Sequence, residues 1–453
     1  MRLPFRSLSV VLLVALLSWA QAPRPATNVS VNAKLSAPSG ICTGTLNGTT
    51  ALWVSQSGAG AQDGTTQAKA RPLSYYGNVL NWGGGGTKID PGDTVCLTGT
   101  ITGALTPQGS GSAGNVITID GTNATLSTGT GASISSKSYL TFDHLTWANG
   151  MTDSIDLTSS SNITIQNCHA DQTVQGNFVY AAGGGNSNIT VKWCFVAQAT
   201  NSSAFQQDIL KAEGGSGFIF EGNDLTLRAN SNCAECHDDI VQTYCSGGTP
   251  SNISIRYNRM TMDTTQSENK STLQMECDGG TNYIYGNLFP CIQGAGGGNL
   301  NAMYSGVSVT WHVYNNSTYS PNGACQPAWR FLNTSTSTHK NNIIYHATTG
   351  TALEISGTVS MTCTFNDIYT PNGAGNDCVG SNNITTNPLY TDIAMLDLTL
   401  QSGSPSKGTG TVVSNLGSET FNQGPCTTAT WPKPTLCTRN PTTWDRGSFV
   451  VTP

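Results

Sequence analysis

Apolar and polar residues alternate in short segments that recur along most of the chain. The clearest form is an eight-residue phrase that starts with Ser-Asn, at 161–168, 187–194 and 251–258. Alternation with a period of two is typical of a β-strand with one buried face. In these and related segments, apolar pairs stand five and three residues before the end of the phrase: Ile117/Ile119, Leu140/Phe142, Ile163/Ile165, Ile189/Val191, Phe218/Phe220, Ile253/Ile255 and Trp311/Val313.

The ends of these phrases recur at intervals of 23 to 35 residues. They lie at Thr122, Leu145, Cys168, Cys194, Asn223, Asn258, Asn287, Asn316, Asn342 and Asn366. Such a period, with no helical spacing between the strands, predicts a solenoid in which each repeat forms one turn and packs on the next. We therefore expect an all-β, single-stranded right-handed parallel β-helix of about ten turns, stacked at the ~4.8 Å separation of paired strands.

A second set of short strands lies between the first. Its third position is apolar in every repeat and is expected to face inward: Ile155, Val179, Leu210, Val241, Leu273, Met303, Trp329 and Leu353. The next residue should then face outward: Asp156, Tyr180, Lys211, Gln242, Gln274, Tyr304, Arg330 and Glu354. Glu213, Tyr244 and Glu276 stand two residues after members of this outward column and should share its face.

Composition agrees with a polar solenoid. Only 10% of the 453 residues are charged, Gly reaches 51, and the formal net charge of −6 comes without a basic run, which argues against a nucleic-acid partner. The Asn-Xaa-Ser/Thr triplets at Asn162, Asn188 and Asn252 could accept glycans, but their fixed place in the repeat favours turn residues.

The N-terminus has the layout of a secretory signal peptide. Two arginines precede an apolar run from Leu8 to Trp19 and then small residues, which predicts a signal peptide over 1–20, with cleavage after Ala20 or Ala22. No other apolar run is long enough to cross a bilayer. We expect a secreted or extracellular monomer, periplasmic if retained, with an N-terminal segment over 21–50, a β-helix over 51–400 and a closing, disulfide-linked tail over 401–453.

Rings and planar polar groups about 5 Å apart on a rigid sheet can stack on and hydrogen-bond successive sugars, which predicts an extracellular polysaccharide as partner. A solvated sheet face is the alternative. The residues expected to bind substrate are Tyr180, Glu213, His237, Gln242, Tyr244, Gln274, Glu276, Tyr304 and Arg330.

Acidic residues gather in the central repeats, where Asp208 stands one repeat before Asp238 and Asp239. Converging carboxylates repel one another unless they share a proton or a cation. Calcium, which takes about six to eight oxygen ligands, would relieve this repulsion.

The entry phrases at 52–58 and 89–95, and the closing phrases at 387–392, 400–405 and 444–448, resemble those of the pectate-lyase-like β-helix superfamily. The central repeats resemble the calcium-binding turns of the family-nine pectate lyases. By that resemblance Asp208, Asp238 and Asp239 would hold calcium. The family's further aspartate falls at Gln242 and its base lysine falls near Gln274, so both positions depart from the pattern.

Three functions remain open from the sequence. The first is calcium-assisted β-elimination on a pectate-like, uronate-containing polysaccharide, with Asp208, Lys211, Asp238 and Asp239 as the catalytic set and Lys211 as the base. Lys270 and Arg330 are alternative bases. The second is glycoside hydrolysis of the polygalacturonase type, in which two carboxylates such as Glu213 and Glu276 act as acid and base. The third is carbohydrate binding at a surface without catalysis.

Fourteen cysteines in a secreted chain predict disulfides. Their places in the repeat favour Cys168–Cys194 and Cys245–Cys277, with Cys363–Cys378 and Cys426–Cys437 as local loops. Elimination leaves Cys42–Cys96, Cys291–Cys325 and Cys233–Cys236. The segment Cys233-Ala-Glu-Cys236-His237 also has the spacing of a c-type haem site, but no helical cytochrome pattern surrounds it, so haem is disfavoured.

Overall fold

A computed structural model describes residues 42, 51–148, 155–173, 177–198, 208–228, 238–263, 270–293, 301–321, 329–347, 351–373 and 375–450. The expected signal peptide and most of the segment over 21–50 lie outside these residues. The described part has a single α-helix, α1 (Leu73–Tyr76), and three short 3₁₀ turns, Gln67–Lys69, Val79–Asn81 and Ile393–Met395. None of the described helices could span a membrane.

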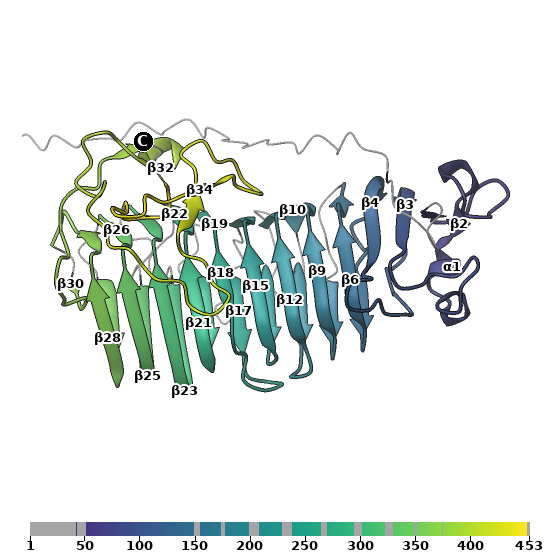
Figure 1. Cartoon of the computed structure of the whole chain (residues 1–453), viewed down its shortest axis with the longest axis horizontal. Coiled ribbons are helices and arrows are strands. Elements are labelled where there is room, and N and C mark those ends of the chain that lie inside the picture. The colour runs from purple at the N-terminus through teal and green to yellow at the C-terminus, as the bar shows by residue number, and fades with distance from the viewer. Residues whose placement is uncertain are drawn as a thin grey trace, which may run out of the picture. The chain divides into compact units, whose positions relative to one another are not determined.

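Parallel strands stack into three columns along the chain (Figure 1). The first column contains β4 (Ile117–Leu126), β6 (Ser138–Asp143), β9 (Ser161–Gln166), β12 (Ser187–Lys192), β15 (Ser216–Glu221), β18 (Ser254–Arg256), β21 (Gly280–Tyr285), the end of β23 (Asn301–Tyr314), the end of β25 (Trp329–Lys340) and β28 (Val359–Thr364). These are the strands that the recurring phrase predicts.

From β6 onward, each strand of the first column leads through a tight turn into the second column, whereas the end of β4 itself reaches the second column at Leu126. That column contains β7 (Thr146–Trp147), β10 (His169–Thr173), β13 (Phe195–Gln198), β16 (Asp224–Leu227), β19 (Arg259–Asp263), β22 (Leu288–Gln293), β24 (Ser317–Ser320), β26 (Ile343–His346) and β29 (Asp367–Tyr369).

The third column returns the chain to the first. It contains β5 (Ala132–Ser135), β8 (Ile155–Thr158), β11 (Val179–Ala182), β14 (Leu210–Glu213), β17 (Asp238–Tyr244), β20 (Lys270–Glu276), the starts of β23 and β25, β27 (Thr351–Ser356) and β30 (Gly375–Asn376).

The expected all-β parallel solenoid is confirmed. About eight regular turns, from β6 to β27 in the described residues, have a strand in every column, and partial turns flank them. The apolar pairs of the first column are buried throughout. In the third column, the described inward residues are also buried, for example Leu210, Val241 and Leu273 at 0% exposure. Period-two patterning thus determines which face of each strand enters the core.

A buried asparagine ladder fixes the turn between the first and second columns. It contains the phrase-end residues Asn223, Asn258, Asn287, Asn316, Asn342 and Asn366. Each Oδ1 accepts the backbone N–H of the phrase-end residue one turn earlier. Each amide also donates to a backbone carbonyl, as Asn287 does to Ile255 at 2.8 Å. The ladder therefore satisfies backbone groups that the turn leaves unpaired.

Asn162, Asn188 and Asn252 have φ values of 53 to 55°, in the left-handed region that asparagine tolerates. Asn162 and Asn188 are the second residues of β9 and β12, so they lie in strands rather than in turns. The Nδ2 of Asn188 donates to Oδ1 of Asn162 at 3.2 Å, and the Nδ2 of Asn252 donates to Oγ of Ser216 at 2.9 Å. These asparagines form a short exposed row, in contrast to the buried ladder.

The first turn is irregular and carries α1 beside β1 (Leu52–Ser55), β2 (Arg71–Pro72) and β3 (Thr94–Ile101). The C-terminal part contributes two antiparallel pairs, β31 (Tyr390–Asp392) with β32 (Asp397–Leu400), and β33 (Gln423–Pro425) with β34 (Leu436–Thr438). Glu419, in this tail, accepts hydrogen bonds from Arg256 at 2.8 Å and Tyr285 at 2.5 Å. The tail is thereby fastened to the first column.

Four expected disulfides are confirmed: Cys42–Cys96, Cys245–Cys277, Cys363–Cys378 and Cys426–Cys437. Cys291 is also disulfide-bonded, while Cys325, Cys233 and Cys236 lie outside the described residues.

The expected Cys168–Cys194 bond is wrong, because both residues are free and buried. Each thiol instead donates to a carbonyl of its own turn, Cys168 to Gln166 and Cys194 to Lys192, both at 3.4 Å. Stacked positions on adjacent turns therefore do not by themselves make a disulfide, since Cys245 and Cys277 are bonded at such positions whereas Cys168 and Cys194 are not.

Candidate functional site

The outward face of β11, β14, β17 and β20 brings most of the expected site residues together. Tyr180 pairs with Lys211, Lys211 with Gln242, and Gln242 with Gln274, in the predicted order. Beside this column, Glu213 pairs with Tyr244, and Glu276 lies one turn further on. Two adjacent columns of polar and aromatic residues therefore cross four turns.

The expected place of Tyr304 is wrong by two residues. Gln274 pairs with Ala302, and Tyr304 pairs with Glu276 in the neighbouring column. An even displacement keeps a residue on the same face of the sheet. Arg330 remains in the first of the two columns, where it pairs with Ala302 and Glu354, and its Nε donates to Glu354 at 3.1 Å. His237 and the side chain of Lys270 lie outside the described residues.

Lys211 is the central cation of this face. Its Nζ lies 3.3 Å from Oδ2 of Asp208 and 4.0 Å from Oε1 of Glu213. The Lys211 side chain is only 13% exposed, and its Nζ also lies 5.8 Å from the centre of the Tyr244 ring. These contacts are made by the ammonium form, so as a base Lys211 would first have to leave Asp208.

Asp208 and Asp239 begin their turns at equivalent positions, as predicted, and both are buried. Oδ1 of Asp208 accepts the backbone N–H of Asp239 at 3.1 Å, and Oδ1 of Asp239 accepts that of Ser271 at 2.8 Å. Asn177 does the same for the N–H of Asp208 at 3.1 Å. One carboxylate oxygen of each aspartate therefore accepts a backbone N–H from the next turn, much as the side chains of the asparagine ladder accept backbone N–H groups.

Burial disfavours the charged forms of the Asp208 and Asp239 side chains. Burial raises the pKa of Asp208 to about 7, against the opposing effect of Lys211. Burial and the neighbouring Asp208 raise the pKa of Asp239 well above its usual range. Protonation or a bound cation would relieve the pair.

The donor set can be tested against calcium. Oδ2 of Asp208, Oδ2 of Asp239 and Oε1 of Gln242 are buried and accept no hydrogen bond. Such oxygens suit a hard cation in chemistry. The described residues contain no group of three or more His, Cys, Asp or Glu side chains that is placed to hold a metal ion. The residues therefore fit calcium in donor type, and Lys211 already contacts one of the oxygens.

The second column carries acids and rings. Glu213 accepts a hydrogen bond from Oγ of Ser246 at 2.5 Å, and Glu276 accepts one from Nε2 of Gln274 at 2.8 Å. Burial and the Glu213 carboxylate raise the pKa of Tyr180. The Tyr244 side chain is 45% exposed and offers an open ring.

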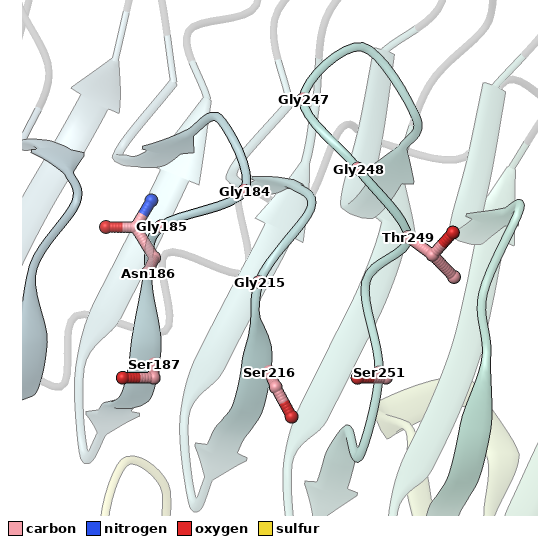
Figure 2. A pocket seen from close by; sticks show the side chains of 10 residues that line it. All are labelled: Gly184, Gly185, Asn186, Ser187, Gly215, Ser216, Gly247, Gly248, Thr249 and Ser251. Atoms are coloured by element: carbon pink, nitrogen blue, oxygen red, sulfur yellow. The ribbon is translucent and has the colours of Figure 1, made fainter.

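A groove of about 430 Å³ lies beside the Glu213 column, where three turns pass from the third column to the first (Figure 2). Its lining is uncharged and is formed by Gly184, Gly185, Asn186, Ser187, Gly215, Ser216, Gly247, Gly248, Thr249 and Ser251. A Cβ on Gly184 would lie 2.3 Å from the carbonyl oxygen of Gly247, so the turns approach too closely for any larger residue. The strand pattern does not predict this groove, although glycine pairs recur in the sequence at its three turns.

Comparisons with known proteins identify the fold. No protein-family model matches the sequence, and no curated protein matches it. The structure of pectate lyase Pel9A is similar with a TM-score of 0.52 and 12% identity, over 89% of this chain and 98% of that one. A rhamnogalacturonan lyase matches with a TM-score of 0.45 and 10% identity, over 76% and 90% of the chains. PfbA, a surface adhesin of Streptococcus pneumoniae, matches with a TM-score of 0.35 and 9% identity, over 67% of this chain and 84% of that one. The match to Pel9A shows that the chain has a parallel β-helix fold like that of this protein.

Proposed function

We propose that this chain is a secreted polysaccharide lyase that binds a uronate-containing polysaccharide across β11, β14, β17 and β20 and cleaves it by β-elimination. The observation that carries the proposal is the placement of Lys211, a nearly buried ammonium among carboxylates, between the rings of Tyr180 and Tyr244 on an otherwise polar face. The disulfides suit an oxidising extracellular compartment.

Elimination requires removal of the proton at C5 of the uronate. The electron pair of that C–H bond forms the C4–C5 double bond while the bond from C4 to the bridging oxygen breaks, and that oxygen takes a proton. Calcium held by Asp208, Asp238 and Asp239, with the Gln242 carbonyl, would supply neutralisation of the sugar carboxylate. Lys211 is the base in this proposal, and it must first leave Asp208 and lose its proton.

The remaining residues of the face bind and orient the sugar. Tyr244 offers an open ring against which a sugar face can stack. Glu213 and Glu276 accept hydrogen bonds from protein groups and have further lone pairs for sugar hydroxyls. The uncharged groove beside Glu213 leaves room for a neighbouring part of the polysaccharide.

Glycoside hydrolysis is the second candidate, because Glu213 and Glu276 lie in one column with only the Tyr244 turn between them. Two strand spacings amount to about 9.6 Å. Inverting hydrolases separate their two carboxyl groups by roughly 6.5 to 9.5 Å. This pair would serve if the two side chains lean toward each other.

The test uses purified mature protein with a panel of pectate-like and other uronate polysaccharides. The expected result is a rise in the ultraviolet absorbance of unsaturated uronate products, lost in Lys211→Ala and Asp239→Asn. Lys192→Ala is the control, because Lys192 lies in the first column and packs on Trp193. New reducing ends without that absorbance would replace the lyase by the hydrolase. Binding without either product would leave a carbohydrate-binding protein.

A further inference from the structure

We propose that Lys211 competes with a divalent cation for Asp208, so that a cation binds this site only when the ammonium leaves Asp208 and turns toward the open face. The inference deepens the proposed function, since it concerns the same site. It depends on the cation site and not on the bond that is cleaved, so the two can fail separately.

The hydrogen bonds of the two aspartates leave little choice of position for a cation. Oδ1 of Asp208 is held by the N–H of Asp239, and Oδ1 of Asp239 by the N–H of Ser271. The carboxylate oxygens that these hydrogen bonds leave available to a cation are therefore the Oδ2 atoms of Asp208 and Asp239. The Oδ2 of Asp239 accepts no hydrogen bond, whereas the Oδ2 of Asp208 lies 3.3 Å from Nζ of Lys211.

A second orphaned oxygen lies on the Lys211 side of the site. Gln242 pairs with Lys211 across adjacent turns, is 3% exposed, and has an Oε1 that accepts no hydrogen bond. Buried acceptors are seldom left without a donor, because each unsatisfied acceptor makes the fold less stable. One cation can satisfy several acceptors at once. Among the residues that the structure describes, the Lys211 ammonium lies within ion-pair distance of two carboxylates only, those of Asp208 and Glu213.

Lys211 has another place to go. Its Nζ already lies 4.0 Å from Glu213, and the Tyr244 ring beyond is open to solvent. If Lys211 leaves Asp208, its ammonium can therefore pair with Glu213 instead and does not lose its counter-ion. The movement would carry the ammonium from the buried aspartate toward the face on which the substrate is proposed to bind.

The competition predicts a change in calcium affinity that can be measured without any polysaccharide. Two unit charges about 4 Å apart near a protein surface interact by several kcal/mol. Removing the ammonium should therefore raise calcium affinity by at least about tenfold, which corresponds to ~1.4 kcal/mol. Lys211→Met keeps the length of the side chain and removes its charge, while Lys211→Arg keeps the charge.

The experiment is a calorimetric titration of Ca²⁺ into the mature wild-type protein, Lys211→Met, Lys211→Arg and the control Lys192→Met, with the melting temperature recorded with and without Ca²⁺. The expected order is tighter binding and a larger thermal shift in Lys211→Met than in the other three. Asp239→Asn in the Lys211→Met background should abolish the gain. Far-ultraviolet circular dichroism establishes that each variant is folded.

Equal or weaker calcium binding by a folded Lys211→Met would overturn the competition, and so would a gain of the same size in Lys211→Arg. If Lys211→Met does not fold, Lys211→Gln takes its place with the same expectation. Cleavage of polysaccharide is measured in a separate assay. A gain in calcium affinity without cleavage of any polysaccharide would remove the lyase and keep the competition, whereas cleavage with unchanged calcium affinity would do the reverse.

Discussion

Asn258 accepts two hydrogen bonds from Asn223 through a single atom: its Oδ1 lies 2.9 Å from the backbone N and 3.0 Å from the side-chain Nδ2 of Asn223. Both residues are fully buried. The amide of Asn258 in turn donates to the carbonyl of Phe220 at 2.8 Å and to Asn287 at 3.0 Å. Each asparagine thus links three successive turns, and the ladder ties the solenoid together along its length.

The ladder predicts a large loss of stability in Asn287→Ala. The substitution leaves the buried N–H of Asn258 and the carbonyl of Ile255 without their partners. Each unsatisfied buried group costs about 1–3 kcal/mol, so for two groups we expect a loss of about 2–6 kcal/mol in the free energy of unfolding, measured by denaturant titration.

The matched control is Asn188→Gly, in the exposed row. Asn188 has a φ of 53° and only a 3.2 Å contact with Asn162, and glycine adopts such a φ without strain. We expect a change within about 0.5 kcal/mol. Equal effects at the two positions would contradict a special role for the buried ladder.

The sequence predicted the columns because burial of one strand face leaves a period of two that survives variation in loop length. The buried pairs from Ile117 to Val313 and the outward column from Tyr180 to Gln274 follow from that rule alone. Tyr304 was misplaced because the register after a long connection depends on how many residues the connection holds. The site chemistry depends on rotamers, and no pattern could predict that Lys211 bends back to Asp208 or that Cys168 and Cys194 bond to carbonyls.

The C-terminal tail should loosen in Arg256→Met. Arg256 pairs with Glu221 at 2.6 Å and with Glu419 at 2.8 Å, and the Glu419 side chain is 8% exposed. Removing the cation leaves the buried Glu419 carboxylate without a counter-ion. An uncompensated buried charge typically costs about 3–5 kcal/mol, and the hydrogen bonds from Tyr285 and Ser254 should reduce this loss. We expect faster proteolysis within residues 401–450 together with a lower melting temperature.

The control for the tail is Arg228→Met. Arg228 contacts Asp171 at 3.5 Å, and the Asp171 side chain is 43% exposed. Exposed pairs of this kind contribute about 0–1 kcal/mol. A tail that remains equally resistant to protease in Arg256→Met and Arg228→Met would show that other contacts hold it.

The open ring of Tyr244 should contribute to carbohydrate binding. Its side chain is 45% exposed on the proposed face. Loss of a stacked ring commonly costs about 0.5–1.5 kcal/mol beyond the lost contact area, so Tyr244→Ala should weaken polysaccharide binding roughly three- to tenfold. Affinity electrophoresis measures this, with Tyr283→Ala in the first column as the control. Binding that weakens equally in both would place the polysaccharide elsewhere.

Asp208 should make the fold less stable as pH rises. Burial raises its pKa to about 7 from an ordinary value of 3.8, so the folded state binds more protons than the unfolded state between these values. The free energy of unfolding should therefore fall as pH rises from 4 to 7, and the cost is complete above 7. The difference between the folded and unfolded pKa of Asp208 is about three, and each pKa unit corresponds to about 1.36 kcal/mol. The fall in the free energy of unfolding is therefore at most roughly 4 kcal/mol. In Asp208→Asn the side chain can still accept the N–H of Asp239 but no longer titrates. The fall in the free energy of unfolding between pH 4 and 7 should therefore be smaller in this variant than in wild type.

Asp143 supplies the opposite sign in the same titration. Burial works against its carboxylate, but hydrogen bonds from His144, Asn167 and Gln166 outweigh burial and lower its pKa. Its contribution is present above the unfolded value and is lost as pH falls, so the difference between wild type and Asp143→Asn should shrink in acid. Denaturant titrations of wild type, Asp208→Asn and Asp143→Asn from about pH 2 to 8 separate the two effects, because the Asp143 contribution changes only below its unfolded value of 3.8. If Asp208→Asn follows the wild-type curve in parallel, Asp208 does not carry the buried proton, and the remaining fall belongs to Asp239, whose raised pKa has the same sign.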